Sequence, residues 1–250
     1  MGATPPIAGR EAWQQQIDTL LVREKAHTRE GDAIAAARRR LPMVEVDPAT
    51  PLVGADGEVP LLDTFEGRSQ LFASYHMWHT GLPAADQCEG CTFNTGQALE
   101  LSYLHSRDVT FAVFCGGPYD QSNRYREFMD WDMPWYSVPE SSYDRLALVE
   151  TPPWHTFGMK ACYLRDGDRV YETYWTTARG CEAMSGSYGM LDMTAYGRQE
   201  PWEDSPEGWP QSFGRGPGEP QVGQFRLDGR PIPQWSRLAA GRSDDLGSGR

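Results

Sequence analysis

The sequence predicts an α/β protein built on a mixed β-sheet with helices on both of its faces. Residues 70–75 and 109–115 have the length and apolar composition of buried strands, and a helical segment separates them. Further along, residues 160–165 and 170–176 form two strands joined by Asp166-Gly167-Asp168, a strong hairpin signal. This order, βαβα followed by a hairpin and a helix, predicts both parallel and antiparallel pairs in one sheet.

Size and charge narrow the class of protein. The 250 residues have a net charge of -12, a mean hydropathy of -0.59 and a hydrophobic content of 39%. These values indicate a globular chain that fits one domain with extensions or two small domains. The acidic balance disfavours nucleic acid and anionic membrane surfaces as partners, so we expect neither.

The predicted location follows from the segments that the sequence lacks. No apolar run approaches the length of a membrane span, and residues 1–11 have neither the basic nor the apolar part of a secretion signal. We therefore expect a cytoplasmic protein, in which thiols are kept reduced. Five cysteines in such a compartment fit one working pair and three bystanders.

Residues 1–43 are predicted to form an N-terminal helical extension. Trp13, Ile17, Leu20 and Leu21 recur at helical spacing within residues 10–40. We expect Gly31-Asp32 to break or cap this segment into two helices, the second ending at Leu41-Pro42. The basic run at residues 38–40 is explained by the preference of a helix C-terminus for cations.

Residues 44–198 are predicted to form the α/β domain. We expect a strand at 44–46, a loop to residue 57, a short helix or turn at 61–68, and helices at 91–105, 120–131 and 181–191. A short extended piece follows Met133-Pro134-Trp135.

Residues 199–250 are predicted to be an irregular tail, since residues 199–220 contain five prolines and four glycines. The tail contains Trp202 and Trp209, and the N-terminal extension contains Trp13. Three exposed tryptophans would be unusually many for a monomer. We therefore expect a homo-oligomer.

The pair Cys88 and Cys91, in Cys88-Glu89-Gly90-Cys91, is where the sequence concentrates chemistry. Two intervening residues bring the thiols within reach across one helical turn, which permits a reversible disulfide or a grip on a soft metal. At the start of a helix, unpaired N–H groups and the helix dipole stabilise a thiolate. The first cysteine is then the attacking group and the second resolves the mixed disulfide.

Several segments resemble the DUF899 family of thioredoxin-like proteins. They include Cys88-Glu89-Gly90-Cys91-Thr92-Phe93 and Met129-Asp130-Trp131-Asp132-Met133-Pro134-Trp135. The others are residues 20–29, 38–44, 61–71, 107–110, 174–180 and 188–198. The resemblance covers about residues 15–200 and implies a thioredoxin-like or peroxiredoxin-like fold without a settled activity. The chain departs from the family in a shorter insert before the hairpin, in His79 and in the tail.

The favoured hypothesis is a thiol-disulfide oxidoreductase that needs no cofactor and acts on a small-molecule or protein thiol. Cys88 would be the nucleophile and Cys91 the resolving thiol. Thioredoxin-like enzymes place a cis-proline before the strand that faces the dithiol, whereas Pro152 and Pro153 stand six or more residues before residue 160.

A peroxidase is a weaker alternative. Peroxiredoxins use a Pro-x-x-x-Thr/Ser-x-x-Cys loop, but Gly81 stands seven residues before Cys88 and Asp86 is not at the hydroxyl position. Arg179 is the candidate cation for either redox reaction.

The main alternative is a metal-dependent enzyme, with copper before zinc. Cys88 and Cys91 would bind the ion with His76, His79 or His155, since thiolate and imidazole suit both metals. His76 and His79 converge only if the strand has ended by about Met77, because residues three apart point to opposite faces of a strand.

A third alternative is a non-catalytic binding module whose aromatic tail mediates assembly. The remaining cysteines carry no predicted chemistry: Cys115 and Cys162 lie in buried strands, and Cys181 begins a helix.

Overall fold

The computed structural model describes residues 4–148, 157–200, 202–210, 233–243, 245 and 246. The chain divides into two compact units. One comprises Met1–Pro42 with Asp204–Pro210, and the other comprises Met43–Glu203 with Gln211–Arg250.

The first unit contains one long helix, α1 (Arg10–Arg38, 29 residues), with no buried residue. The predicted helix is present, but the predicted break at Gly31-Asp32 is wrong, because α1 runs through both residues. One glycine costs a helix only about 1 kcal/mol relative to alanine. The alanines at 33 and 35–37 favour the helix on its C-terminal side.

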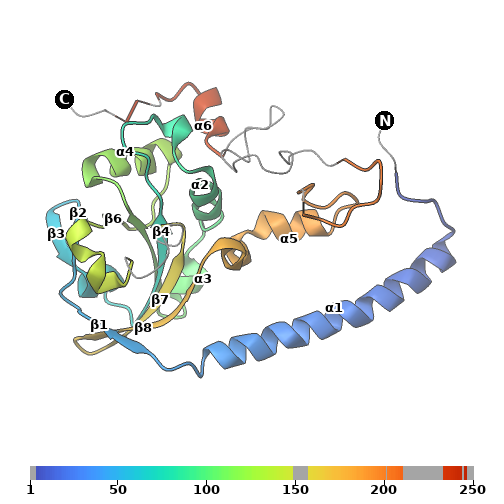
Figure 1. Cartoon of the computed structure of the whole chain (residues 1–250), viewed down its shortest axis with the longest axis horizontal. Helices are drawn as coiled ribbons and strands as arrows, with labels where there is room; N and C mark the ends of the chain where they lie inside the picture. The colour runs from blue at the N-terminus through green and yellow to red at the C-terminus, as the bar shows by residue number, and fades with distance from the viewer. Residues whose placement is uncertain (1–3, 149–156, 201, 211–232, 244, 247–250) are drawn as a thin grey trace. The chain divides into compact units, whose positions relative to one another are not determined.

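The second unit is organised around an eight-stranded sheet in the order β1-β8-β7-β4-β5-β6-β2-β3 (Figure 1). The strands are β1 (Val44–Val46), β2 (Pro51–Gly54), β3 (Gly57–Pro60), β4 (Gln70–His76), β5 (Val109–Cys115), β6 (Trp135–Ser137), β7 (Lys160–Asp166) and β8 (Arg169–Thr176). The central strands β4, β5 and β6 are parallel, and β7 joins β4 antiparallel. Both kinds of pairing predicted from the sequence are therefore present in one sheet.

Two hairpins form parts of this sheet. β7 and β8 pair antiparallel, and Gly167 in the turn has a φ of 61°, which glycine adopts without steric cost. β2 and β3 pair antiparallel around Ala55 and Asp56, where the sequence predicts a loop. Proline has no N–H to donate to a neighbouring strand. Pro60 is tolerated because β3 is the edge strand of the sheet.

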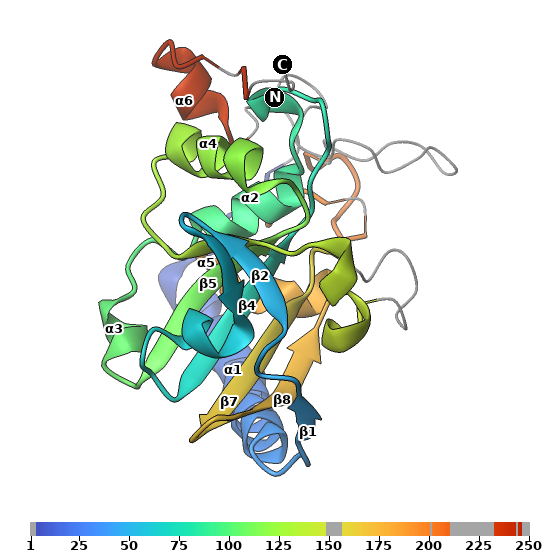
Figure 2. The same cartoon turned by 90° about the vertical axis from the view of Figure 1, so that its left-hand side faces the viewer.

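Helices α2 (Glu89–Gly96), α3 (Ser102–His105) and α4 (Tyr119–Met129) pack on one face of the sheet (Figure 2). The single helix expected at 91–105 is thus two short ones. Residues 89–96 contain two glycines, two threonines and an asparagine, all poor helix formers, so α2 ends after eight residues. The 3-10 turns η1 (Leu61–Phe65), η3 (Glu140–Ser142) and η4 (Asp144–Leu146) lie at the other face.

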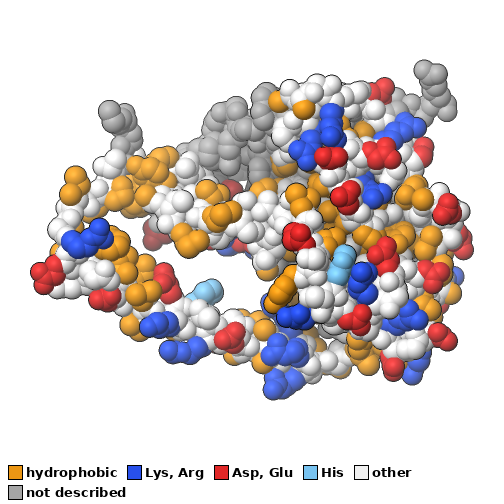
Figure 3. Space-filling view, turned by 180° about the vertical axis from the view of Figure 1, so that it is seen from behind, with side chains coloured by type: hydrophobic (Ala, Val, Ile, Leu, Met, Phe, Trp, Pro, Cys, Tyr) orange, Lys and Arg blue, Asp and Glu red, His pale blue; other side chains and the backbone are white. Residues whose placement is uncertain are grey.

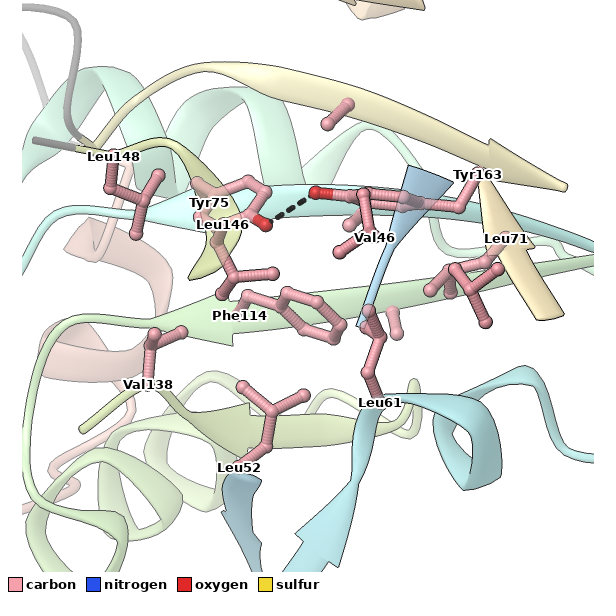
Figure 4. Close-up of a cluster of buried hydrophobic side chains, with 14 of the residues drawn as sticks. Val46, Leu52, Leu61, Leu71, Tyr75, Phe114, Val138, Leu146, Leu148 and Tyr163 are labelled. Atoms are coloured by element: carbon pink, nitrogen blue, oxygen red, sulfur yellow. Dashed lines mark hydrogen bonds between the residues drawn. The ribbon is translucent and has the colours of Figure 1, made fainter. Parts of the chain in front are cut away.

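Each face of the sheet has its own buried core. Figure 4 shows the core under η1, where the Tyr75 and Tyr163 hydroxyls share a hydrogen bond of 2.7 Å. The core on the helical face contains Phe111, Val113, Tyr125 and Trp135. β5 is buried on both sides, which explains its continuous apolar sequence.

The segment after β8 continues in helical turns. η6 (Ala178–Met184) and α5 (Gly186–Asp192) replace the single helix expected at 181–191. They are fastened to α2: Ser185 Oγ donates to Asn94 Oδ1 at 2.7 Å, and Gln97 Oε1 accepts from the Ser187 hydroxyl at 2.9 Å.

The described end of the tail packs on α4 through the short helix α6 (Trp235–Ala239) and the residues after it. Arg237 donates two hydrogen bonds to the Met129 carbonyl, at 3.0 and 2.9 Å, and Arg242 donates to the Phe128 carbonyl at 2.8 Å. The last carbonyls of a helix lack partners within it, so these arginines cap α4.

On the face drawn in Figure 3, acidic and basic side chains are interspersed over much of the surface. Among the described residues, none of the helices combines the length and the apolar character that crossing a bilayer requires.

Candidate redox site

The predicted dithiol lies at the N-terminus of α2, next to the end of β4. Cys88 is the N-cap residue, and its sulfur accepts the backbone N–H of Cys91 at 3.4 Å. Cys88 is half-buried, whereas Cys91 is only 5% exposed. An incoming molecule therefore reaches Cys88 first, and Cys91 stands behind it.

The loop between β4 and α2 is held by Gln87, whose side chain is buried. Gln87 Oε1 accepts the His79 N–H at 3.0 Å, and Gln87 Nε2 donates to the carbonyls of His79 at 2.9 Å and Leu82 at 3.0 Å. The Gln87 side chain thus provides hydrogen-bond partners for backbone groups of the loop, as a neighbouring strand does in a sheet. These three bonds fix the position of the chain immediately before Cys88.

The buried thiol of Cys91 lies against the end of β4. The Met77 N–H donates to Cys91 Sγ at 3.4 Å. None of the five cysteines is in a disulfide in this structure.

A hydrogen bond between the two thiol groups moves their pKa values in opposite directions. The pKa of Cys91 is lowered, first because the Cys88 thiol donates a hydrogen bond to it; the Lys160 ammonium and the Met77 N–H act the same way, against the effect of burial. The pKa of Cys88 is raised because it donates that hydrogen bond and is itself largely buried. When the reduced pair loses one proton, the negative charge therefore lies mainly on Cys91.

A buried polar network supports α2 from below. Thr92 Oγ1 donates to the Cys88 carbonyl at 2.7 Å and shares a hydrogen bond of 2.5 Å with the Tyr125 hydroxyl. Gln234 Nε2 donates to Tyr125 at 3.0 Å and also to the Ala84 carbonyl at 3.2 Å. α4 and the described tail therefore both position the helix that carries the dithiol.

His76 is completely buried at the end of β4. Its Nδ1–H donates to the Met77 carbonyl at 2.8 Å, and Nε2 has no partner in the described structure. Its ring lies among aromatic rings, with centroids 5.4 Å from Trp135 and 5.7 Å from Tyr125. Burial lowers the pKa of His76 to about 3, so the imidazole is neutral at physiological pH.

The metal-ligand set is not assembled in the described part of the chain. No three or more His, Cys, Asp or Glu side chains there come close enough together to hold an ion. His76 points into its aromatic surroundings, and His79 is half-buried in the loop that Gln87 holds. His155 falls outside the described residues, as do Pro152 and Pro153.

Arg179, the predicted cation, is engaged elsewhere. Its Nε donates to Glu182 Oε1 at 2.9 Å, and its guanidinium lies 3.8 Å from the ring centroid of Trp202. Glu182 also binds Arg198 at 2.8 Å. None of the contacts of Arg179 among the described residues joins it to the dithiol.

Cys115 and Cys181 are buried thiols outside this motif. Cys115 is fully buried, which raises its pKa to about 12. Burial also raises the pKa of Cys181, whose thiol donates to the Gly158 carbonyl at 3.4 Å. Neither is poised to form a thiolate at neutral pH.

Four residues of the site are not singled out by the sequence: Gln87, Tyr125, Lys160 and Gln234. Gln87 immediately precedes Cys88, and this position next to the motif is the one signal in the sequence that could have identified it. The other three are brought to the site by strand pairing and helix packing, for which the local sequence gives no signal.

The fold and the site together define a thioredoxin-like class of protein. A strand, a dithiol helix and a parallel strand are followed by an antiparallel hairpin that pairs with the first strand. The particular family is given by residues 2–214, which match the family described as "Bacterial protein of unknown function (DUF899)", and the chain belongs to that family.

Comparisons with known proteins add likenesses of fold only. A protein described as a putative thiol:disulfide interchange protein DsbE from Chlorobium tepidum is 15% identical, with a TM-score of 0.40 over 58% of this chain and 93% of that one. BsSco, of the Sco family of cytochrome c oxidase assembly proteins, is 15% identical, with a TM-score of 0.35 over 58% and 96%. Peroxiredoxin 6 of Arenicola marina, solved as a cysteine-to-serine mutant, is 12% identical, with a TM-score of 0.34 over 60% and 74%. The sequence has no match among the curated proteins.

Proposed function

We propose that this protein is a thiol-disulfide oxidoreductase that uses Cys88 as the attacking thiol and Cys91 as the resolving thiol. The observation that carries the proposal is the graded exposure of two hydrogen-bonded thiols at the start of α2. This arrangement supplies an accessible sulfur, a neighbouring base and a second sulfur one turn away.

The first step makes a mixed disulfide. The Cys88 sulfur attacks one sulfur of a substrate disulfide, the substrate S–S bond breaks, and the first substrate thiolate leaves. The proton of Cys88 passes to the Cys91 thiolate as the new S–S bond forms. Attack by the thiolate form is general for this exchange, so removing that proton during attack is what the pair must achieve.

The second step releases the other half of the substrate. The Cys91 sulfur attacks Cys88, the Cys88–Cys91 disulfide forms, and the second substrate sulfur leaves with the proton of Cys91. The substrate has then gained the two electrons that the dithiol has lost. A thiol or dithiol reductant resets the pair by the reverse exchange.

A trapping experiment tests the assignment of the two roles. The reduced Cys91→Ser protein is mixed with oxidised glutathione and mapped by mass spectrometry. We expect a stable glutathione adduct on Cys88, because the resolving sulfur is absent. Reduced wild-type protein should instead release two equivalents of glutathione and hold a Cys88–Cys91 disulfide.

The matched controls are Cys88→Ser and Cys162→Ser. Cys162 is the other half-buried cysteine, so its loss should leave both outcomes unchanged, whereas Cys88→Ser should abolish them. An adduct on Cys91 in Cys88→Ser, forming as fast as the adduct on Cys88, would overturn the order of attack. Thiols that remain unmodified in the wild type would overturn the function.

A further inference from the structure

Lys160 is a buried lysine in a chain that otherwise uses arginine for its cations. The sequence contains two lysines, Lys25 and Lys160, against 21 arginines. Lys25 is exposed on α1, whereas Lys160 is 2% exposed at the start of β7. Lysines are almost never buried to this extent without a partner.

The pairing of β7 with β4 turns Lys160 toward the dithiol helix. Lys160 lies opposite Ser74, and Lys160 Nζ donates to Ser74 Oγ at 2.9 Å. Side chains alternate along a strand, and the neighbours Ala73 and Tyr75 belong to the core on the face away from the helices. Ser74 and Lys160 therefore share the face that α2 covers.

No carboxylate neutralises this ammonium among the described residues, where Ser74 is its one hydrogen-bond partner. Arg198, which is also largely buried, shows the usual solution and pairs with both Asp192 and Glu182. The charge of Lys160 must then be balanced by a group that becomes negative.

Several titratable groups lie on the side of the sheet to which Lys160 points. They include Cys91 from α2, Cys181 from η6, His76 from β4 and Cys162 two residues along β7. Cys115 from β5 and Tyr125 from α4 belong to the core on the same face, and burial raises the pKa of both. His76 is neutral and can supply no negative charge, and the Cys181 thiol keeps its proton against the Gly158 carbonyl. Cys91 is the group whose sulfur already accepts a backbone N–H and the thiol of Cys88.

We propose that Lys160 is a positioning residue that serves as the fixed counter-charge of the dithiol, holds the negative charge of the reduced pair on Cys91 and thereby sets its reduction potential. The inference about the potential rests on the proposed function. A charge kept on Cys91 makes that sulfur the acceptor of the Cys88 proton, which leaves the exposed Cys88 free to attack.

The counter-charge favours the reduced pair over the disulfide. When the Cys88–Cys91 bond forms, two electrons go to the substrate, the thiolate is consumed, and Lys160 loses its anion. A cation near a thiolate typically lowers the thiol pKa by at least one unit, a factor of about ten in thiolate population. A tenfold change in the equilibrium of this two-electron couple corresponds to about 30 mV.

The test compares Lys160→Met with Lys160→Arg, and uses Lys25→Met as the matched control. Two properties are measured: the pH profile of iodoacetamide alkylation of the reduced dithiol, and the Cys88–Cys91 equilibrium in glutathione buffers. In Lys160→Met, we expect the profile to move up by about one pH unit and the disulfide to become roughly tenfold harder to reduce. Lys160→Arg should restore both within about threefold, and Lys25→Met should change neither. Values for Lys160→Met within twofold of wild type would overturn the proposal.

A second measurement uses the wild-type protein, so it tests the proposal even if the Lys160 variants do not fold. With 13C-labelled lysine, the chain gives two side-chain signals, one from each lysine. We expect the Lys160 signal to shift at the pH at which the dithiol loses its proton, while the Lys25 signal does not follow that transition. A Lys160 signal that ignores the transition would overturn the proposal. Alkylation and labelling both use the reduced protein, so they decide the role of Lys160 even if no disulfide forms and the proposed function fails.

Discussion

Gly117→Ala should displace the loop that lies against the dithiol. A Cβ atom at residue 117 would stand 2.4 Å from Cγ and 2.5 Å from Cδ1 of the Trp78 ring. Ordinary contact begins near 3.4 Å, so the ring must retreat by about 1 Å (3.4 minus 2.4). The indole already packs against Tyr125, with ring centroids 6.1 Å apart, and cannot move freely in that direction.

Overpacking of this kind costs about 1–3 kcal/mol. With a urea dependence of about 2 kcal/mol per molar, a loss of about 2 kcal/mol lowers the unfolding midpoint by about 1 M. Trp78 follows Met77, whose N–H donates to Cys91 Sγ. The displaced ring should therefore also slow alkylation of the dithiol at neutral pH.

The assay is urea unfolding followed by tryptophan fluorescence, with Gly90→Ala as the control. Gly90 lies between the two cysteines, and a Cβ atom there would meet nothing within 4 Å. Alanine in this helical position should leave stability unchanged or raise it by up to about 1 kcal/mol. Equal midpoints for the two variants, or a Gly117→Ala midpoint equal to that of wild type, would refute the packing argument.

Two further variants probe the buried residues around the site. For His76, the unfolded imidazole binds a proton near pH 6.5 and the folded one only near pH 3, so the unfolded state holds more protons between these values. Stability is therefore full above pH 6.5 and falls with decreasing pH, by about 1.4 kcal/mol per pH unit from this one group. Urea unfolding at pH 7, 6 and 5 should show this slope in wild type and a shallower one in His76→Asn; parallel curves would contradict it. Tyr125→Phe removes the hydroxyl shared by Thr92 and Gln234, which keep other partners, and should cost about 1 kcal/mol in the same assay. An unchanged midpoint would mean that this network does not support α2.

The strands of the sheet could be predicted because their signals are local. β5 is a continuous apolar run buried on both faces, and the turn of the β7–β8 hairpin contains Asp166-Gly167-Asp168. The β2–β3 hairpin has the same Asp-Gly turn signal at Asp56-Gly57. The sequence nevertheless predicts a loop there, because the two strands have four residues each and include prolines, which an edge position tolerates.

The thiols of the site could also be predicted, but their electrostatic surroundings could not. Cys88 and Cys91 are neighbours in the sequence, and a CxxC at a helix start has a recognised chemistry. Lys160 is brought to the same face by the register of β7 on β4, which joins residues 86 positions apart. The sequence makes Arg179 a candidate cation. Its contacts with Glu182 and Trp202 depend on the folding of the chain after β8, which the local sequence does not reveal.

The central claim is that Cys88 and Cys91 exchange electrons as a dithiol pair. The most direct measurement equilibrates the wild-type protein in glutathione buffers of graded potential and maps each cysteine after alkylation. We predict a single two-electron transition in which Cys88 and Cys91 become linked while Cys115 stays a thiol. Cysteines 88 and 91 that remain thiols throughout, or that purify with one equivalent of copper or zinc lost on Cys88→Ser, would contradict the claim.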